Sequence, residues 1–231
     1  MRILLYELVG ADASRPFSPH CWKAAMALAH KELDCRSVPT CFTAVPAVEG
    51  GAFPTVPVIR DGDRIVGDSF DIALYLENTY PDRPSLFGGE GGRALARFVE
   101  RWCQTMVNPY LGAAAMLDIH DCLAPADQAY FRESREKRNN GRSLESVASE
   151  RDARHAEFLK KLEPLRSMLT FQPFIGGSSP LFADYIVFGS FQWVRITSRY
   201  PFLSADDPIS DWFARCLDLH GGFARRVPAL A

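Results

Sequence analysis

The segment from Phe17 to Leu28 constrains the fold most, because it joins a predicted strand to a helix with a well-defined start. An apolar run over residues 3–6 precedes it and predicts a buried strand. Ser18 stands where a helix N-cap belongs, and Pro19 occupies the first helical position, where an amide proton would have no partner. A strand, a loop and a helix that begins at a hydroxyl form a place that favours an anion, although most such serines are only caps.

The composition is that of a globular chain without an electrostatic preference for polyanions. Of 231 residues, 47% are hydrophobic and 23% are charged, and the formal net charge is -2, which gives no argument for a nucleic acid or membrane partner. The sequence has no apolar run near the roughly 18–20 residues of a membrane span and no secretory signal pattern. Six scattered cysteines without a Cys-x-x-Cys pair indicate neither a metal site nor a disulfide framework. We therefore expect a cytoplasmic protein that binds no metal.

The first 84 residues predict an α/β unit. Two β-rich runs flank an Asp-Gly turn at residues 61–62, which is typical of an antiparallel hairpin. The full order is strand, helix, strand, strand, strand, helix, which favours a parallel pair joined by a helix, followed by the hairpin and a covering helix. These elements are expected at residues 3–6, 18–31, 35–39, 55–59, 64–66 and 70–80.

The remainder of the chain predicts helices only. The glycine-rich stretch at residues 88–92 indicates a flexible boundary, so we expect a linker at 85–92 and an all-helical domain at 93–231. Pro109 and Pro164 are expected to bend two of the longer helices. The helices are expected at residues 93–117, from about 130 onward, and at 142–171, 182–200 and 209–219.

Three short motifs occur in one order along this pattern. They are Ser18–Pro19 at a helix start, Val56–Pro57 before the hairpin, and Asp68–Ser69 at the start of the next helix. Followed by a helix that begins at Phe182–Tyr185, they resemble the cytosolic glutathione S-transferase superfamily over nearly the whole chain. The resemblance implies a thioredoxin-like domain at residues 1–84, an all-α domain behind it, and a homodimer.

Further residues resemble one branch of that superfamily. Trp22 and Lys23 follow the first motif, Tyr80–Pro84 ends a helix, and Asp206–Trp212 lies near the C-terminus. This combination is similar to bacterial glutathione-dependent β-etherases, which act on lignin-derived aryl ethers, and to related fungal serine-type transferases. The closer resemblance implies cleavage of a β-aryl ether by glutathione.

The resemblance also implies roles for the three motifs in binding glutathione as co-substrate. Ser18 would stabilise the glutathione thiolate, because a free thiol with a pKa of about 8.5 is mostly protonated at neutral pH. The bond before Pro57 would be cis, turning the backbone of Val56 toward the peptide. Asp68 and Ser69 would bind the ammonium and carboxylate of the γ-glutamyl group, whereas their residue types alone predict a helix cap.

Two subsites are left open by the sequence. Residues 40–54 contain no lysine, arginine or histidine, although many family members contact the glycyl carboxylate there. Backbone amides, Thr43, Arg15 and Lys23 are candidates for that contact. Candidates for a pocket that binds a small hydrophobic electrophile are large side chains that are equally typical of a helical core. They are Phe17, Trp102, Met106, Tyr110, Phe191 and Trp193.

Asp184 is expected to cap the core helix and to have a structural role. Leu181 stands where the family has a hydroxyl residue, so Ser178 or Ser179 is the candidate replacement. The leading hypothesis is a glutathione transferase that uses an apolar, aromatic electrophile. The alternatives are a non-catalytic binding module with the same fold, and a disulfide reductase that uses Cys21, which we rank last because residue 18 is not a cysteine.

Overall fold

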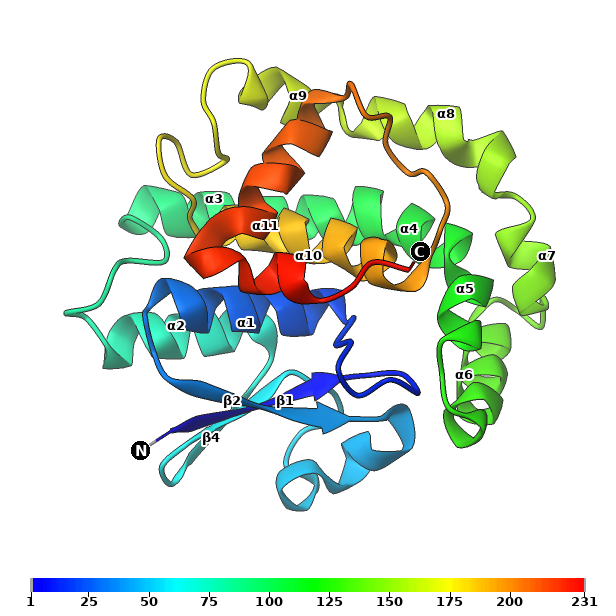
Figure 1. Cartoon of the computed structure of the whole chain (residues 1–231), viewed down its shortest axis with the longest axis horizontal. Coiled ribbons are helices and arrows are strands. Elements are labelled where there is room, and N and C mark those ends of the chain that lie inside the picture. Colours follow the sequence, from blue (N-terminus) through cyan, green and yellow to red (C-terminus); the bar gives the residue numbers. More distant parts are fainter. Residues whose placement is uncertain (1, 231) are drawn as a thin grey trace.

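The computed structural model describes residues 2–230, which form a sheet domain followed by helices (Figure 1). The four strands are ordered β2-β1-β3-β4, with β1 and β2 parallel and the other neighbours antiparallel. This arrangement confirms the predicted thioredoxin-like α/β unit. Its elements are β1 (Ile3–Leu8), α1 (Pro19–His30), β2 (Cys35–Thr40), the 3-10 helix η1 (Phe42–Gly51), β3 (Val58–Asp61), β4 (Arg64–Gly67) and α2 (Ser69–Thr79).

The second part of the chain is helical, as predicted. Helices α1 and α2 lie between the sheet and this helical part, and α6 extends down beside the sheet domain (Figure 1). None of the helices within residues 2–230 combines the length and the hydropathy needed to cross a membrane. The helical elements are α3 (Glu90–Trp102), the π-helix η2 (Cys103–Val107), α4 (Asn108–Ala114), α5 (Met116–Asp121), α6 (Pro125–Arg138), α7 (Leu144–Ala148), α8 (Arg151–Lys161), α9 (Glu163–Leu169), α10 (Phe182–Thr197) and α11 (Pro208–Arg226).

Several helix boundaries differ from the prediction. The single helix expected at 142–171 is divided into α7, α8 and α9. Pro164 lies in the first turn of α9, where its missing N–H costs nothing, so it begins a helix instead of bending one. The last helix was predicted to end at residue 219; residues 219–222 are non-helical, but the helix then resumes and continues to Arg226.

The glycine-rich boundary is shorter than expected. Helix α3 begins at Glu90, three residues before the predicted start at residue 93. The two residues Leu86 and Phe87 within the expected linker are buried, and the amide of Phe182 donates to the carbonyl of Leu86 at 2.8 Å. These residues are therefore packed against the core helix. The domain division at residues 84 and 93 stays a prediction.

Helix α10 is the core helix that its apolar sequence predicts, since nearly all of its residues are buried. It packs against α1 and α3. At Gly189 a Cβ atom would lie 2.3 Å from the carbonyl oxygen of Pro19, so only glycine permits this approach of the two backbones. The contact fixes the N-terminal end of α1 against the helical domain and thereby sets the position of Ser18.

Candidate active site

The ends of the four strands bring the three motifs to one edge of the sheet. Val58, which begins β3, pairs with Gly67 at the end of β4 and with Tyr6 in β1. Leu8 at the end of β1 pairs with Thr40 at the end of β2. The strand ends therefore follow one another in the order β4, β3, β1, β2, with a spacing of about 4.8 Å. The loops that leave these ends carry the candidate residues.

Ser18 is the N-cap of α1 and lies directly beyond the end of β1. The amide of Phe17 donates to the carbonyl of Leu8 at 3.1 Å, and the Oγ atom of Ser18 accepts from the amide of Cys21 at 3.4 Å. Ser18 is only 5% exposed. Its cap bond is longer than the usual 2.7–3.2 Å, and its hydroxyl also lies near the thiol of Cys21, which is a weak acceptor. A hydroxyl can accept through a lone pair and still donate its proton, so the cap leaves that proton available to a ligand.

The peptide bond between Val56 and Pro57 is cis, which confirms the expectation from the resemblance. It lies just before β3, in the middle of the four strand ends. Neither backbone polar group of Val56 forms a hydrogen bond within the part of the chain that the structure describes. Both groups are therefore free to pair with an extended peptide, as in the addition of a strand to a sheet edge.

Asp68 follows β4 and caps α2, as its residue type predicts. Its Oδ1 atom accepts from the amides of Phe70 and Asp71 at 2.8 and 3.2 Å. Its Oδ2 atom has no partner among residues 2–230, and the side chain is exposed. The φ angle of 66° is uncommon for a residue other than glycine, and such backbone strain is concentrated at ligand sites. Ser69 is buried beside it as the first residue of the helix.

A buried group of charges lies one turn further along α1. Lys23 is 1% exposed, and its Nζ atom donates to Glu100 of α3 and to Nδ1 of His20, both at 3.3 Å. Burial and, to a smaller extent, the charge of Lys23 lower the pKa of His20 to about 4, although Asp68 acts in the opposite direction. The first turn of α1 is therefore held to α3 by an ion pair and carries a neutral imidazole.

We expect the free energy of unfolding to decrease as the pH falls from about 6.5, the ordinary pKa of histidine, to about 4. In this range the unfolded chain binds a proton at His20 that the folded protein does not bind. His20→Gln should lose less stability over the same range, as measured by urea unfolding. Burial raises the pKa of Glu7 to about 7 and produces an opposite trend, but that trend is common to both proteins and cancels. Identical pH profiles would contradict the role of His20.

The candidates for the second-substrate pocket differ in burial and in their contacts. Tyr110 is buried in the helical domain, where its ring stacks on Phe158 at 4.2 Å and its hydroxyl donates to the carbonyl of Arg151. Trp102 is half-buried at the end of α3, and Met106 is exposed in η2. Phe191 is buried in α10, and Trp193 of the same helix is half-buried and packs against Gly112. Tyr110 belongs to the hydrophobic core.

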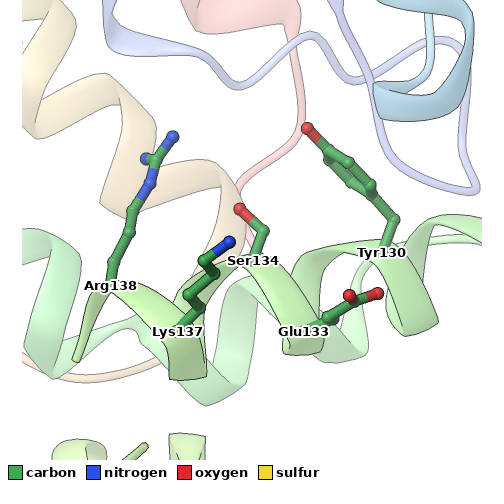
Figure 2. A pocket seen from close by; sticks show the side chains of 5 residues that line it. All are labelled: Tyr130, Glu133, Ser134, Lys137 and Arg138. Atoms are coloured by element: carbon green, nitrogen blue, oxygen red, sulfur yellow. The ribbon is translucent and has the colours of Figure 1, made fainter. Parts of the chain in front are cut away.

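Phe17 lines a cavity of ≈ 220 Å³ between the two domains. The loop after β1 forms one wall, with Arg15 among its residues, and the ends of α5 and α10 form the other. A second, open depression of ≈ 460 Å³ lies on α6 alone (Figure 2). Its lining residues are Tyr130, Glu133, Ser134, Lys137 and Arg138. Residues 2–230 contain no group of three or more side chains that could hold a metal ion.

No sequence motif pointed to α6, yet this helix contacts the candidate site. Asp127, which is 1% exposed, accepts from the amides of Phe42 and Thr43 at 2.9 Å each. The N–H of Thr43, one of the candidates for the glycyl carboxylate, is thus already used. Pro125 followed by an acidic residue is a helix-start pattern that would have revealed the beginning of α6, but not what it contacts.

Comparisons with protein families and with solved structures give the same two-part fold. The family model of the glutathione S-transferase N-terminal domain matches residues 13–84, and the family model of the C-terminal domain matches residues 94–217. A glutathione S-transferase of Ceriporiopsis subvermispora, solved in complex with glutathione, is 24% identical with a TM-score of 0.80, covering 95% of this chain and 96% of its own. A glutathione transferase of Phanerochaete chrysosporium is 27% identical with a TM-score of 0.75, covering 98% and 94%.

Proposed function

Because the chain belongs to the glutathione S-transferase family, we propose that it is a glutathione transferase that acts on apolar, aromatic electrophiles. One observation carries the proposal. The available proton of Ser18, the free backbone of Val56 and the unpaired Oδ2 of Asp68 lie in succession along one edge of the sheet. These groups suit, respectively, the thiol, the cysteinyl backbone and the γ-glutamyl ammonium of glutathione. The similar Ceriporiopsis structure, which contains glutathione, supports the same ligand.

The reaction follows from the chemistry of a stabilised thiolate. Donation from the hydroxyl of Ser18, beside the N-terminus of α1, favours the charged form of the sulfur. The thiol proton is released to solvent. The thiolate attacks an electrophilic carbon, a carbon–sulfur bond forms, and the bond to the leaving group breaks with its electron pair. In a β-aryl ether, the substrate that the closer resemblance favours, the leaving group is a phenolate.

Two measurements test this function. Isothermal titration calorimetry should show binding of glutathione, and a small panel of aryl ethers and aryl halides should include at least one that is turned over with glutathione. Binding without turnover of any panel member would favour the non-catalytic binding module instead. Absence of binding would overturn the proposal.

The disulfide reductase is the less favoured alternative because of the environment of Cys21. This residue is completely buried and accepts from the amide of Leu8 at 3.5 Å. Burial raises the pKa of its thiol to about 12, so almost none of it is thiolate at neutral pH. A thiol-exchange assay of Cys21→Ala separates this activity from the transferase. The homodimer and the cytoplasmic location stay predictions.

A further inference from the structure

The glycyl carboxylate of glutathione has no evident cationic partner in the sheet domain. The question rests on the proposed function, in which the γ-glutamyl end lies at Asp68. Residues 40–54 contain no basic side chain. Lys23 is buried in its ion pair with Glu100. Arg15 is directed toward the end of α10, where its Nη2 atom donates to the carbonyl of Ile196 at 2.8 Å, while its buried Nε atom has no partner among residues 2–230. These positions favour a partner for the glycyl carboxylate from another part of the chain.

The order of the strand ends shows where that carboxylate lies. A peptide that starts at Asp68, beyond β4, and pairs with Val56, before β3, continues in the same direction past the ends of β1 and β2. From β4 to β2 there are three strand spacings, or about 14 Å. A tripeptide at about 3.5 Å per residue, lengthened by its γ-linked side chain, covers most of this distance. Its C-terminus therefore approaches Phe42, the first residue of η1 after β2.

At this point α6 is packed against η1. Asp127 binds the first two amides of η1, and Arg135 lies two helical turns later on the same side of α6. The Cζ atom of Arg135 is 5.6 Å from the ring centroid of Phe42 and 4.5 Å from that of Phe131. The ring of Phe42 is also next to that of Phe17, at 6.3 Å between centroids, and Phe17 directly precedes Ser18. The guanidinium thus lies against the first residue of η1, two positions after the end of β2.

The guanidinium of Arg135 is half-buried and has no acidic partner within the described residues. Its Nη1 atom donates to the hydroxyl of Ser134 at 3.0 Å, which leaves its other N–H groups free. By contrast, Arg132 on the same helix is paired with Glu136 and Glu145. Burial and the nearby charge of Arg138 lower the pKa of Arg135. An anion that lies against this guanidinium would stabilise its charged form.

We propose that Arg135 binds the glycyl carboxylate of glutathione, so that a helix of the second domain completes the site for the tripeptide. The amides of Phe42 and Thr43 at the start of η1 are occupied by Asp127 and are not available to the carboxylate.

Calorimetric titration with glutathione and with γ-glutamylcysteine, which lacks the glycine, tests this assignment. Arg135→Gln should weaken glutathione binding by about 10- to 100-fold, because it removes a hydrogen bond between two charged groups. It should leave the affinity for γ-glutamylcysteine unchanged, so that the two ligands bind the variant almost equally. Arg135→Lys should recover part of the lost affinity, since it restores the charge without the planar fork.

Lys137→Gln is the matched control, since it removes a cation from an exposed position on the same helix, and glutathione affinity should be unchanged. Circular dichroism of each variant establishes that it is folded. If Arg135→Gln weakens both ligands equally, or neither, the assignment is overturned while the proposed function stands. If Lys137→Gln alone produces the selective loss, Lys137 is the carboxylate partner and the assignment is also overturned. If the wild-type protein binds neither ligand, the assignment and the proposed function are both overturned.

Discussion

Ser18→Ala is expected to lower kcat/KM for the glutathione-dependent reaction by about 10²- to 10³-fold, the usual cost of removing a hydrogen-bond donor from a developing negative charge. The same change should raise the pKa of the bound glutathione thiol, measured from the ultraviolet absorbance of the thiolate as a function of pH. Stability should fall by only about 1 kcal/mol or less, because the cap bond that is lost is a long one, at 3.4 Å.

Ser18→Thr is the matched control for this substitution. Threonine retains both the hydroxyl and the ability to cap a helix, so most of the activity and most of the shift in thiol pKa should remain. A Ser18→Ala variant with the wild-type kcat/KM and the wild-type thiol pKa would show that Ser18 is only the cap of α1. The proposed catalytic role would then be wrong even if glutathione still binds.

The sheet domain was predictable because its signals are local. The cap at Ser18, the turn at Gly62 and the cap at Asp68 each depend on residues within a few positions of one another. The cis bond at Pro57 was predictable only through the resemblance, since a single proline in a strand does not reveal its isomer. These four points fix most of the edge of the sheet on which the candidate site lies.

The contribution of α6 could not be predicted because it depends on contacts between distant parts of the chain. Asp127 and Phe42 are 85 residues apart and belong to different domains. Arg135 occurs in a strongly charged helix, where a solvated face is the simplest interpretation. Only the structure, in which η1 lies against its guanidinium, indicates a role for this residue. The aromatic residues are a similar case, because spacing alone did not separate the buried ring of Tyr110 from a pocket lining.

The largest effect on stability is expected at Asp184. This residue is completely buried, and its carboxylate accepts from the amides of Ile175, Gly176 and Leu181 and from the indole of Trp212, at 2.7 to 3.0 Å. It ties the loop before α10 to α11 as well as to the first turn of its own helix. The structural role predicted from the sequence agrees with these contacts, although Leu181 itself occupies the N-cap position, not Ser178 or Ser179.

Asp184→Ala should lower the free energy of unfolding by at least about 4 kcal/mol, because four buried donors would each lose an acceptor at a cost of about 1–3 kcal/mol. Since a domain is stable by only about 5–15 kcal/mol, much of the variant should be unfolded or aggregated. Asp184→Asn keeps one carbonyl acceptor and should show an intermediate loss in urea unfolding. Asp211→Ala, which removes an exposed carboxylate from the first turn of α11, should change stability by less than about 1 kcal/mol. Equal losses for Asp184→Ala and Asp211→Ala would mean that the buried hydrogen bonds do not hold the core helix in place.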